Sequence, residues 1–147
     1  MKTLRQRALD LLARRDYSRY ELVCRLQQDN NQAELIALLD ELATKGWQSD
    51  ERFVQEYVRT HAQKYGKQYL LQALAQHKID KTLLKTINWG DERHLMFLQW
   101  QKKFGYLPRN AKEKAQQARF LIARGFDRSL VLNMVNQKQV PQDLGET

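Results

Sequence analysis

The chain has 147 residues, with 25 Lys or Arg against 17 Asp or Glu, six Gly, two Pro and one Cys. This composition is typical of a helix-rich protein and argues against a β-sandwich, a β-barrel or a disordered tail. No segment reaches the roughly 18 uninterrupted apolar residues of a membrane span, and the charged start lacks the apolar stretch of a secretory signal. We therefore expect a cytoplasmic protein that does not contact membranes.

Residues 1–48 predict three helices, which we expect over residues 4–15, 18–28 and 31–45. Ser18 and Glu21 have the spacing of a capping box, in which each side chain satisfies a free backbone N–H group. Asn31 repeats this start signal, and Gly46 is placed to end the third helix in a left-handed conformation. We expect Trp47 to fold back onto the last turn and pack in the core.

The rest of the chain repeats this arrangement. Residues 49–90 predict helices over 50–61, 67–77 and 80–87, and residues 91–138 predict helices that start near Asp91, Asn110 and Asp127. Residues 139–147 are polar and predict a flexible tail. Because no run of β-branched residues alternates with period two, the fold class predicted is all-α.

The three segments also match one another in sequence. Sliding the chain by 48 residues places Tyr17 on Tyr65, Leu22 on Leu70 and Leu26 on Leu74; a further 47 places Leu74 on Leu121, Ile79 on Phe126 and Asp80 on Asp127. Two unrelated amphipathic helices can also be slid into partial register, but here the turns match as well as the leucines. Such periods are typical of stacked helical arrays, so we predict three tandem three-helix repeats in an elongated protein.

Positive charge concentrates near the C-terminus. Residues 102–128 contain eight Lys or Arg against two acidic residues, Glu113 and Asp127. A basic stretch of this kind indicates a partner with phosphate groups or an acidic protein surface, although basic helices are also often merely solvated.

No pattern of catalytic residues is present. The three histidines, His61, His77 and His94, fall in different predicted helices without metal-ligand spacing, and the sequence has no glycine-rich phosphate loop. Cys24 lies between leucines, where we expect a packed thiol, and a single cysteine forms neither an internal disulfide nor a zinc site. We expect a protein that is not an enzyme and that carries no metal or cofactor.

Four motifs in order resemble the RecX recombination regulators, over about residues 4–136. They are the run Ala8 to Leu22, Gly46-Trp47 with Asp50-Glu51-Arg52-Phe53, Tyr65-Gly66 with Leu70 and Leu74, and Arg119-Phe120-Leu121-Ile122-Ala123-Arg124-Gly125-Phe126. The chain departs from the family's pattern at Lys64, Lys67 and Lys78, where the family usually has glycine, proline and glycine. These departures add positive charge to the middle repeat.

The resemblance implies three three-helix units in a curved rod, and a monomer that binds the groove of a RecA filament on single-stranded DNA. It further implies that the protein inhibits or modulates ATP hydrolysis, strand exchange or filament extension, and so affects recombination, repair and the SOS response. End capping and groove invasion both remain open as the mode of binding, and free DNA is a weaker candidate partner.

We expect the cations that contact RecA and DNA to lie on one concave surface. They are Arg14, Arg15, Arg19, Arg25, Lys64, Lys67, Lys78, Lys112, Arg119, Arg124 and Arg128. Two other functions remain open. One is a free-standing helix-turn-helix regulator of DNA, although no second helix carries the base-reading cluster that a major groove favours. The other is a scaffold that binds only acidic proteins.

Overall fold

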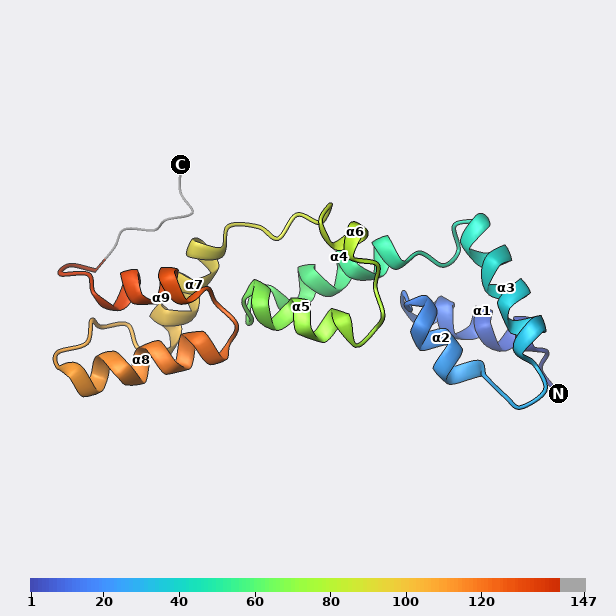
Figure 1. Cartoon of the computed structure of the whole chain (residues 1–147), viewed down its shortest axis with the longest axis horizontal. Helices are drawn as coiled ribbons and strands as arrows, with labels where there is room; N and C mark the ends of the chain where they lie inside the picture. The colour runs from blue at the N-terminus through green and yellow to red at the C-terminus, as the bar shows by residue number, and fades with distance from the viewer. Residues whose placement is uncertain (141–147) are drawn as a thin grey trace. The chain divides into compact units, whose positions relative to one another are not determined.

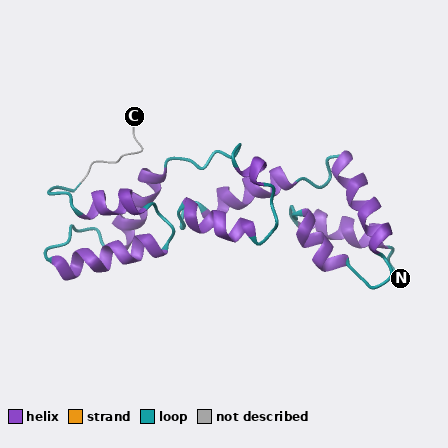
Figure 2. Ribbon diagram, viewed as in Figure 1, coloured by secondary structure: helices purple, strands orange, loops and turns teal. Residues whose placement is uncertain are grey.

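The computed structural model describes residues 1–140, and this part of the chain contains nine helices and no strand (Figure 2). The helices are α1 (Leu4–Arg14), α2 (Arg19–Leu26), α3 (Gln32–Thr44), α4 (Asp50–His61), α5 (Lys67–Ala75), α6 (Lys81–Leu84), α7 (Glu92–Lys103), α8 (Ala111–Ala123) and α9 (Arg128–Val135). The prediction of an all-α fold is confirmed. None of these helices combines the length and apolar character that crossing a bilayer requires, within residues 1–140. The predicted tail lies, from residue 141 onward, outside the described residues.

The chain forms two compact units. The N-terminal unit comprises residues 1–57 and 74–87, and the C-terminal unit comprises residues 58–73 and the described residues from 88 onward. Helices α4 and α5 each contribute residues to both units. Figure 1 shows α1, α2 and α3 grouped within the N-terminal unit, and α7, α8 and α9 grouped within the C-terminal unit. The predicted division at residues 48, 90 and 138 stays a prediction.

The N-terminal unit has a leucine-rich core at the meeting of α1, α2 and α3. Ala8, Leu22, Leu39 and Leu42 are almost completely buried in it. The predicted capping box at the start of α2 is confirmed, because the Ser18 hydroxyl accepts the Glu21 N–H group and the Glu21 carboxylate accepts the Ser18 N–H group at 3.1 Å. This pair fixes where α2 begins and so directs its leucines inward.

Asn31 is the N-cap residue of α3, as the predicted start of this helix requires, but the capping hydrogen bond expected of its side chain is wrong. Its side chain makes no capping hydrogen bond to α3. Instead the amide accepts the Gln28 N–H group at 2.8 Å and donates to the Leu26 carbonyl oxygen at 3.0 Å. The physical reason is that the carbonyl groups at the end of α2 also lack helical partners. A hydrogen bond from a buried amide to one of them stabilises the chain about as much as a capping hydrogen bond does.

Two side chains expected in the core lie at the surface. Trp47 is 45% exposed, with the Lys45 Nζ atom 4.9 Å from the centre of its ring. Gly46 adopts the predicted left-handed φ of 74°, but it is the Trp47 backbone N–H group, not the indole, that closes the helix by donating to the Leu42 carbonyl oxygen at 2.9 Å. Cys24 is exposed as well, because it lies about 200° around α2 from the buried Leu22.

The C-terminal unit is built around Trp100, which is completely buried between α7, α8 and α9. Its indole N–H group donates to the Gln117 Oε1 atom at 2.9 Å, and the Gln117 amide donates in turn to the Tyr106 carbonyl oxygen at 2.9 Å. Gln117 is only 1% exposed. These bonds satisfy two polar groups that would otherwise be costly to bury, so a polar side chain is tolerated in the core.

Positions that the repeat matched have matching roles. Leu26, Leu74 and Leu121 are each at most 1% exposed. Asp80 and Asp127 both cap a helix, accepting N–H groups from the first turns of α6 and α9 at 2.9 and 2.8 Å. The repeated sequence therefore encodes the same buried leucine in all three segments and the same helix start in the second and third.

Candidate functional site

Two glycine turns of the C-terminal unit contact each other directly. The Gly66 N–H group, just before α5, donates to the Arg124 carbonyl oxygen at 2.7 Å, and the Gln68 N–H group donates to the Gly125 carbonyl oxygen at 3.1 Å. A Cβ atom on Gly66 would lie 2.4 Å from the Gly125 backbone, and one on Gly125 would lie 2.4 Å from Tyr69. Only glycine allows the two backbones to approach this closely.

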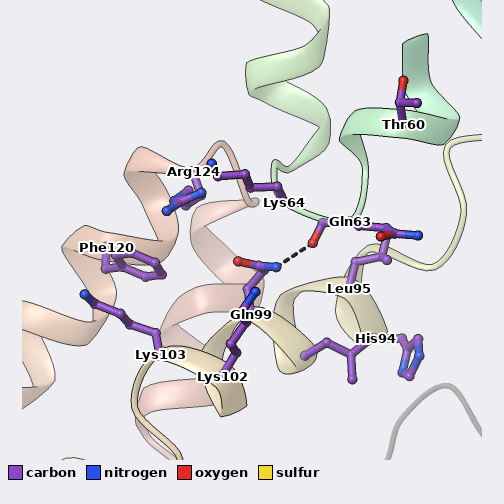
Figure 3. A pocket seen from close by; sticks show the side chains of 11 residues that line it. Thr60, Gln63, Lys64, His94, Leu95, Gln99, Lys102, Lys103, Phe120 and Arg124 are labelled. Atoms are coloured by element: carbon purple, nitrogen blue, oxygen red, sulfur yellow. Dashed lines mark hydrogen bonds between the residues drawn. The ribbon is translucent and has the colours of Figure 1, made fainter. Parts of the chain in front are cut away.

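A cleft of about 750 Å³ lies in the C-terminal unit (Figure 3). Its lining comes from the end of α4 and the residues after it, from one side of α7, and from the last turns of α8. Four of the lining residues are cations, and none is acidic; the four are Lys64, Lys102, Lys103 and Arg124. Four positive charges without a carboxylate in the lining give the cleft a positive potential, which favours an anionic partner.

Arg124 lies between two aromatic rings in this cleft. Its guanidinium carbon is 5.0 Å from the centre of the Phe120 ring and 5.4 Å from the centre of the Tyr65 ring. The Nη1 atom is buried and has no hydrogen-bond partner among the described residues. Cation–π attraction holds the planar group in place without neutralising its charge.

Cations and aromatic rings alternate on either side of Arg124. The Lys103 Nζ atom lies 5.4 Å from the centre of the Phe120 ring, and the Lys64 Nζ atom lies 5.6 Å from the centre of the Tyr65 ring. In Figure 3, Phe120 lies between Arg124 and Lys103. Tyr65 in turn stacks on Tyr69 with ring centres 4.0 Å apart and planes 10° apart. Such interleaving of positive charge and aromatic faces is typical of surfaces that bind single-stranded nucleic acid.

The cleft includes two of the six predicted site residues in this unit, Lys64 and Arg124. The other four do not line it, although all are exposed; they are Lys67, Lys112, Arg119 and Arg128. The Lys67 Nζ atom lies 5.6 Å from the centre of the Trp89 ring. A role for these four residues in binding stays a prediction.

The predicted site residues of the N-terminal unit are partly engaged with other side chains. Arg15 forms an ion pair with Glu21 at 2.9 Å, and Arg19 forms one with Asp40, also at 2.9 Å. Burial alone would raise the pKa of Glu21, but its hydrogen bonds to the Arg15 guanidinium and the Ser18 N–H group lower the pKa overall.

The remaining three residues predicted for the N-terminal unit are exposed, and two of them lie over tyrosine rings. The Arg25 guanidinium carbon is 5.5 Å from the centre of the Tyr17 ring, and the Lys78 Nζ atom is 4.8 Å from the centre of the Tyr20 ring. Arg14 is exposed at the end of α1. None of these three lines the cleft of the C-terminal unit, and their contribution to a binding surface stays a prediction.

Lys102 and Lys103 are two cations of the cleft that are not among the expected site residues, although they belong to the basic stretch over residues 102–128. A signal was present, because Leu95, Leu98 and Lys102 recur at helical spacing. This second stripe of α7 lies beside the buried stripe of Phe97 and Trp100 and forms one side of the cleft.

Comparison with known proteins gives consistent matches. A family model described as "RecX, second three-helix domain" matches residues 49–86, and one described as "RecX, third three-helix domain" matches residues 91–133. The chain is 42% identical over 132 residues to Regulatory protein RecX of Chromobacterium violaceum, covering 88% of this chain and 87% of that protein. It is 39% identical over 133 residues to Regulatory protein RecX of Neisseria gonorrhoeae, covering 88% and 87%. It is 36% identical over 137 residues to that of Ralstonia pickettii, covering 90% and 86%.

Proposed function

The chain belongs to the RecX family of regulatory proteins, and from this premise we propose that it binds RecA filaments on single-stranded DNA and lowers their activity. The activities concerned are ATP hydrolysis, strand exchange and filament extension. The protein acts in this proposal as a cytoplasmic monomer and performs no catalysis itself. Its relatives are named as regulatory proteins rather than as enzymes, which supports this class of function.

The observation that carries the proposal is the cationic cleft of the C-terminal unit. Lys64, Lys102, Lys103 and Arg124 line it without an opposing carboxylate. A filament assembled on DNA presents a regular row of phosphate groups, and several cations that contact phosphates release counterions and so bind tightly at low salt. The other predicted cations of the chain add to the same attraction in this proposal.

The proposal is tested by the ATP hydrolysis of RecA on single-stranded DNA, followed while the chain is titrated in. We expect turnover to fall as the chain is added. Unchanged turnover and unchanged filament length at saturating protein would remove the proposed function.

A pair of matched variants locates the effect. Lys64→Glu with Lys103→Glu reverses two exposed charges of the cleft, whereas Lys81→Glu with Lys85→Glu reverses two exposed charges of the N-terminal unit. Both pairs change the net charge equally and touch no buried residue. We expect the first pair to raise the concentration needed for half inhibition by about tenfold or more, and the second pair to raise it much less. Equal effects of the two pairs would mean that only net charge matters.

A further inference from the structure

We propose that the cleft of the C-terminal unit, together with the Tyr65–Tyr69 pair that contacts Arg124, is a built site for one nucleotide step of a single strand, in which Arg124 binds a backbone phosphate and Tyr69 stacks on a neighbouring base. This assignment deepens the proposed function and rests on it for the source of the strand, namely the DNA within the filament.

The state of Arg124 is the first reason. A guanidinium presents five N–H donors in a rigid fork, and buried donors in folded proteins are nearly always paired. The Arg124 guanidinium forms no ion pair with the described residues, and its Nη1 atom is buried without an acceptor. The buried Nη1 atom is out of reach of a ligand, but Arg124 is only partly buried and its other guanidinium nitrogens are not among the buried atoms, so a ligand's oxygen atoms can approach them, and the planar fork matches the geometry of a phosphate.

The surrounding charges indicate a phosphate strand rather than a single carboxylate. Lys64, Lys102 and Lys103 line the same cleft as Arg124, and the lining includes no acidic residue. Lys64, Lys102 and Lys103 are exposed, so water and salt screen their mutual repulsion, and a ligand of high negative charge is attracted by all four cations. Consecutive phosphates of a polynucleotide supply that charge density, and the amines of Lys64 and Lys103 are placed on opposite sides of Arg124 to receive the neighbours.

The tyrosine pair is the second, independent reason. The Arg124 guanidinium carbon lies 5.4 Å from the centre of the Tyr65 ring, and the Tyr65 ring stacks on the Tyr69 ring, so Tyr65 contacts both residues. Tyr69 is 38% exposed although it is a large aromatic residue. A base that adds to such a stack gains stacking energy whatever its identity. Bases of a duplex are already stacked on both faces, and therefore the site favours a single strand.

The glycine contact holds the two parts of the site at a fixed separation. Gly125 follows Arg124 directly and packs against the backbone of Tyr69, and the Gly66 N–H group is bonded to the Arg124 carbonyl oxygen. Arg124 would thus bind the phosphate group and Tyr69 the base while the backbones of the two residues are already held together in the free protein. Preorganisation of this kind lowers the entropy lost on binding.

Fluorescence anisotropy with a labelled thymidine oligonucleotide, repeated over a range of salt concentrations, tests the assignment of Arg124. We expect Arg124→Gln to weaken binding about tenfold or more and to reduce the slope of log affinity against log salt by about 0.7, the value for one lost phosphate contact on a single strand. Arg93→Gln removes the same charge from an exposed position of the same unit that does not line the cleft, and should change affinity less than about twofold.

Two further arms separate charge, shape and stacking. Arg124→Lys keeps the charge and most of the packing, so we expect the salt slope to be retained while affinity falls, with unchanged helicity and melting. Tyr69→Leu should weaken binding of the thymidine strand about tenfold and leave binding of an abasic strand of equal length unaffected.

The assignment is overturned if Arg124→Gln and Arg93→Gln show the same affinity and salt slope, or if the abasic strand binds as tightly as the thymidine strand. Displacement of the strand by an equal concentration of thymidine triphosphate or of duplex would also overturn it.

The RecA assay distinguishes the two proposals. If Arg124→Gln abolishes strand binding but the unaltered chain leaves RecA turnover unchanged, the proposed function fails and the site stands. If the chain inhibits RecA and Arg124→Gln binds the strand normally, the site fails and the function stands.

Discussion

Substitution of Gly66 by alanine isolates the energetic value of the contact between the two glycine turns. The added Cβ atom would lie 2.4 Å from the Gly125 carbonyl carbon and oxygen and 2.5 Å from the Phe126 nitrogen, all of them backbone atoms that a rotamer change cannot move. The turn before α5 must therefore shift. The shift would stretch or break the hydrogen bonds from the Gly66 and Gln68 N–H groups, which measure 2.7 and 3.1 Å.

The magnitude follows from these two bonds and the overlap. Each net hydrogen bond is worth about 1 kcal/mol, and more where a buried group is left unpaired. Relief of the overlap by a backbone shift adds about 1 kcal/mol or more. We expect Gly66→Ala to lower the free energy of unfolding by about 3 kcal/mol, measured by urea denaturation followed by circular dichroism.

Gly46→Ala is the matched control. Gly46 has a left-handed φ of 74°, but a Cβ atom there would meet nothing within 4 Å. Its substitution should cost only the backbone strain of about 1 to 2 kcal/mol that a side chain pays in this region. The reasoning would be refuted if Gly66→Ala were the milder of the two, or if it left the melting temperature unchanged. Gly66→Ala should in addition weaken oligonucleotide binding, because it moves Lys64 and Tyr65 away from Arg124.

Two further predictions concern the N-terminal unit. Lys78 is the one non-glycine residue within 1–140 with a positive φ, at 53°. Lys78→Gly should raise the urea midpoint, and the free energy of unfolding should rise by about 0.5 to 1 kcal/mol once the greater freedom of glycine in the unfolded chain is subtracted. A lower midpoint would contradict the proposed backbone strain at Lys78. The pKa of Glu21 is lowered in the folded chain, since its bonds to Arg15 and Ser18 outweigh the opposing effect of burial. The Glu21 carboxylate therefore stabilises the folded chain above the pKa of the unfolded carboxyl, and this stabilisation is lost as the pH falls through the folded pKa. The melting temperature of Glu21→Gln should depend less on pH in that acidic window than the melting temperature of the unaltered chain. Identical pH profiles of the two proteins would argue against this linkage.

The starts of the helices could be predicted from sequence because the interactions that fix them are local. The side chains of Ser18, Asp80 and Asp127 accept N–H groups two or three residues further on, and all three caps are present. Asn31 shows the limit of this logic. The same side chain had two sets of unpaired backbone groups within reach, and only the packed structure decides between the start of α3 and the end of α2.

Burial agrees with the sequence pattern along the leucine stripe of α2 and disagrees with it at Trp47. The stripe that contains Leu22 and Leu26 is buried as its period predicts. Trp47 follows a helix end and has no such stripe to belong to, so its hydrophobicity alone gave the wrong expectation. The exposure of the Trp47 side chain depends on the direction that the backbone takes after Gly46.

Local sequence patterns are enough to predict an all-helical, repeated chain with a basic C-terminal segment, and Lys64 and Arg124 could each be named as a candidate separately. The tertiary structure alone decided that these two residues share a cleft with Lys102 and Lys103. The difference lies in the distance along the chain over which the interactions act. Helix periodicity and caps act over three or four residues, whereas the cleft depends on two glycine turns, far apart in the chain, whose contact is set by the packing of the whole C-terminal unit.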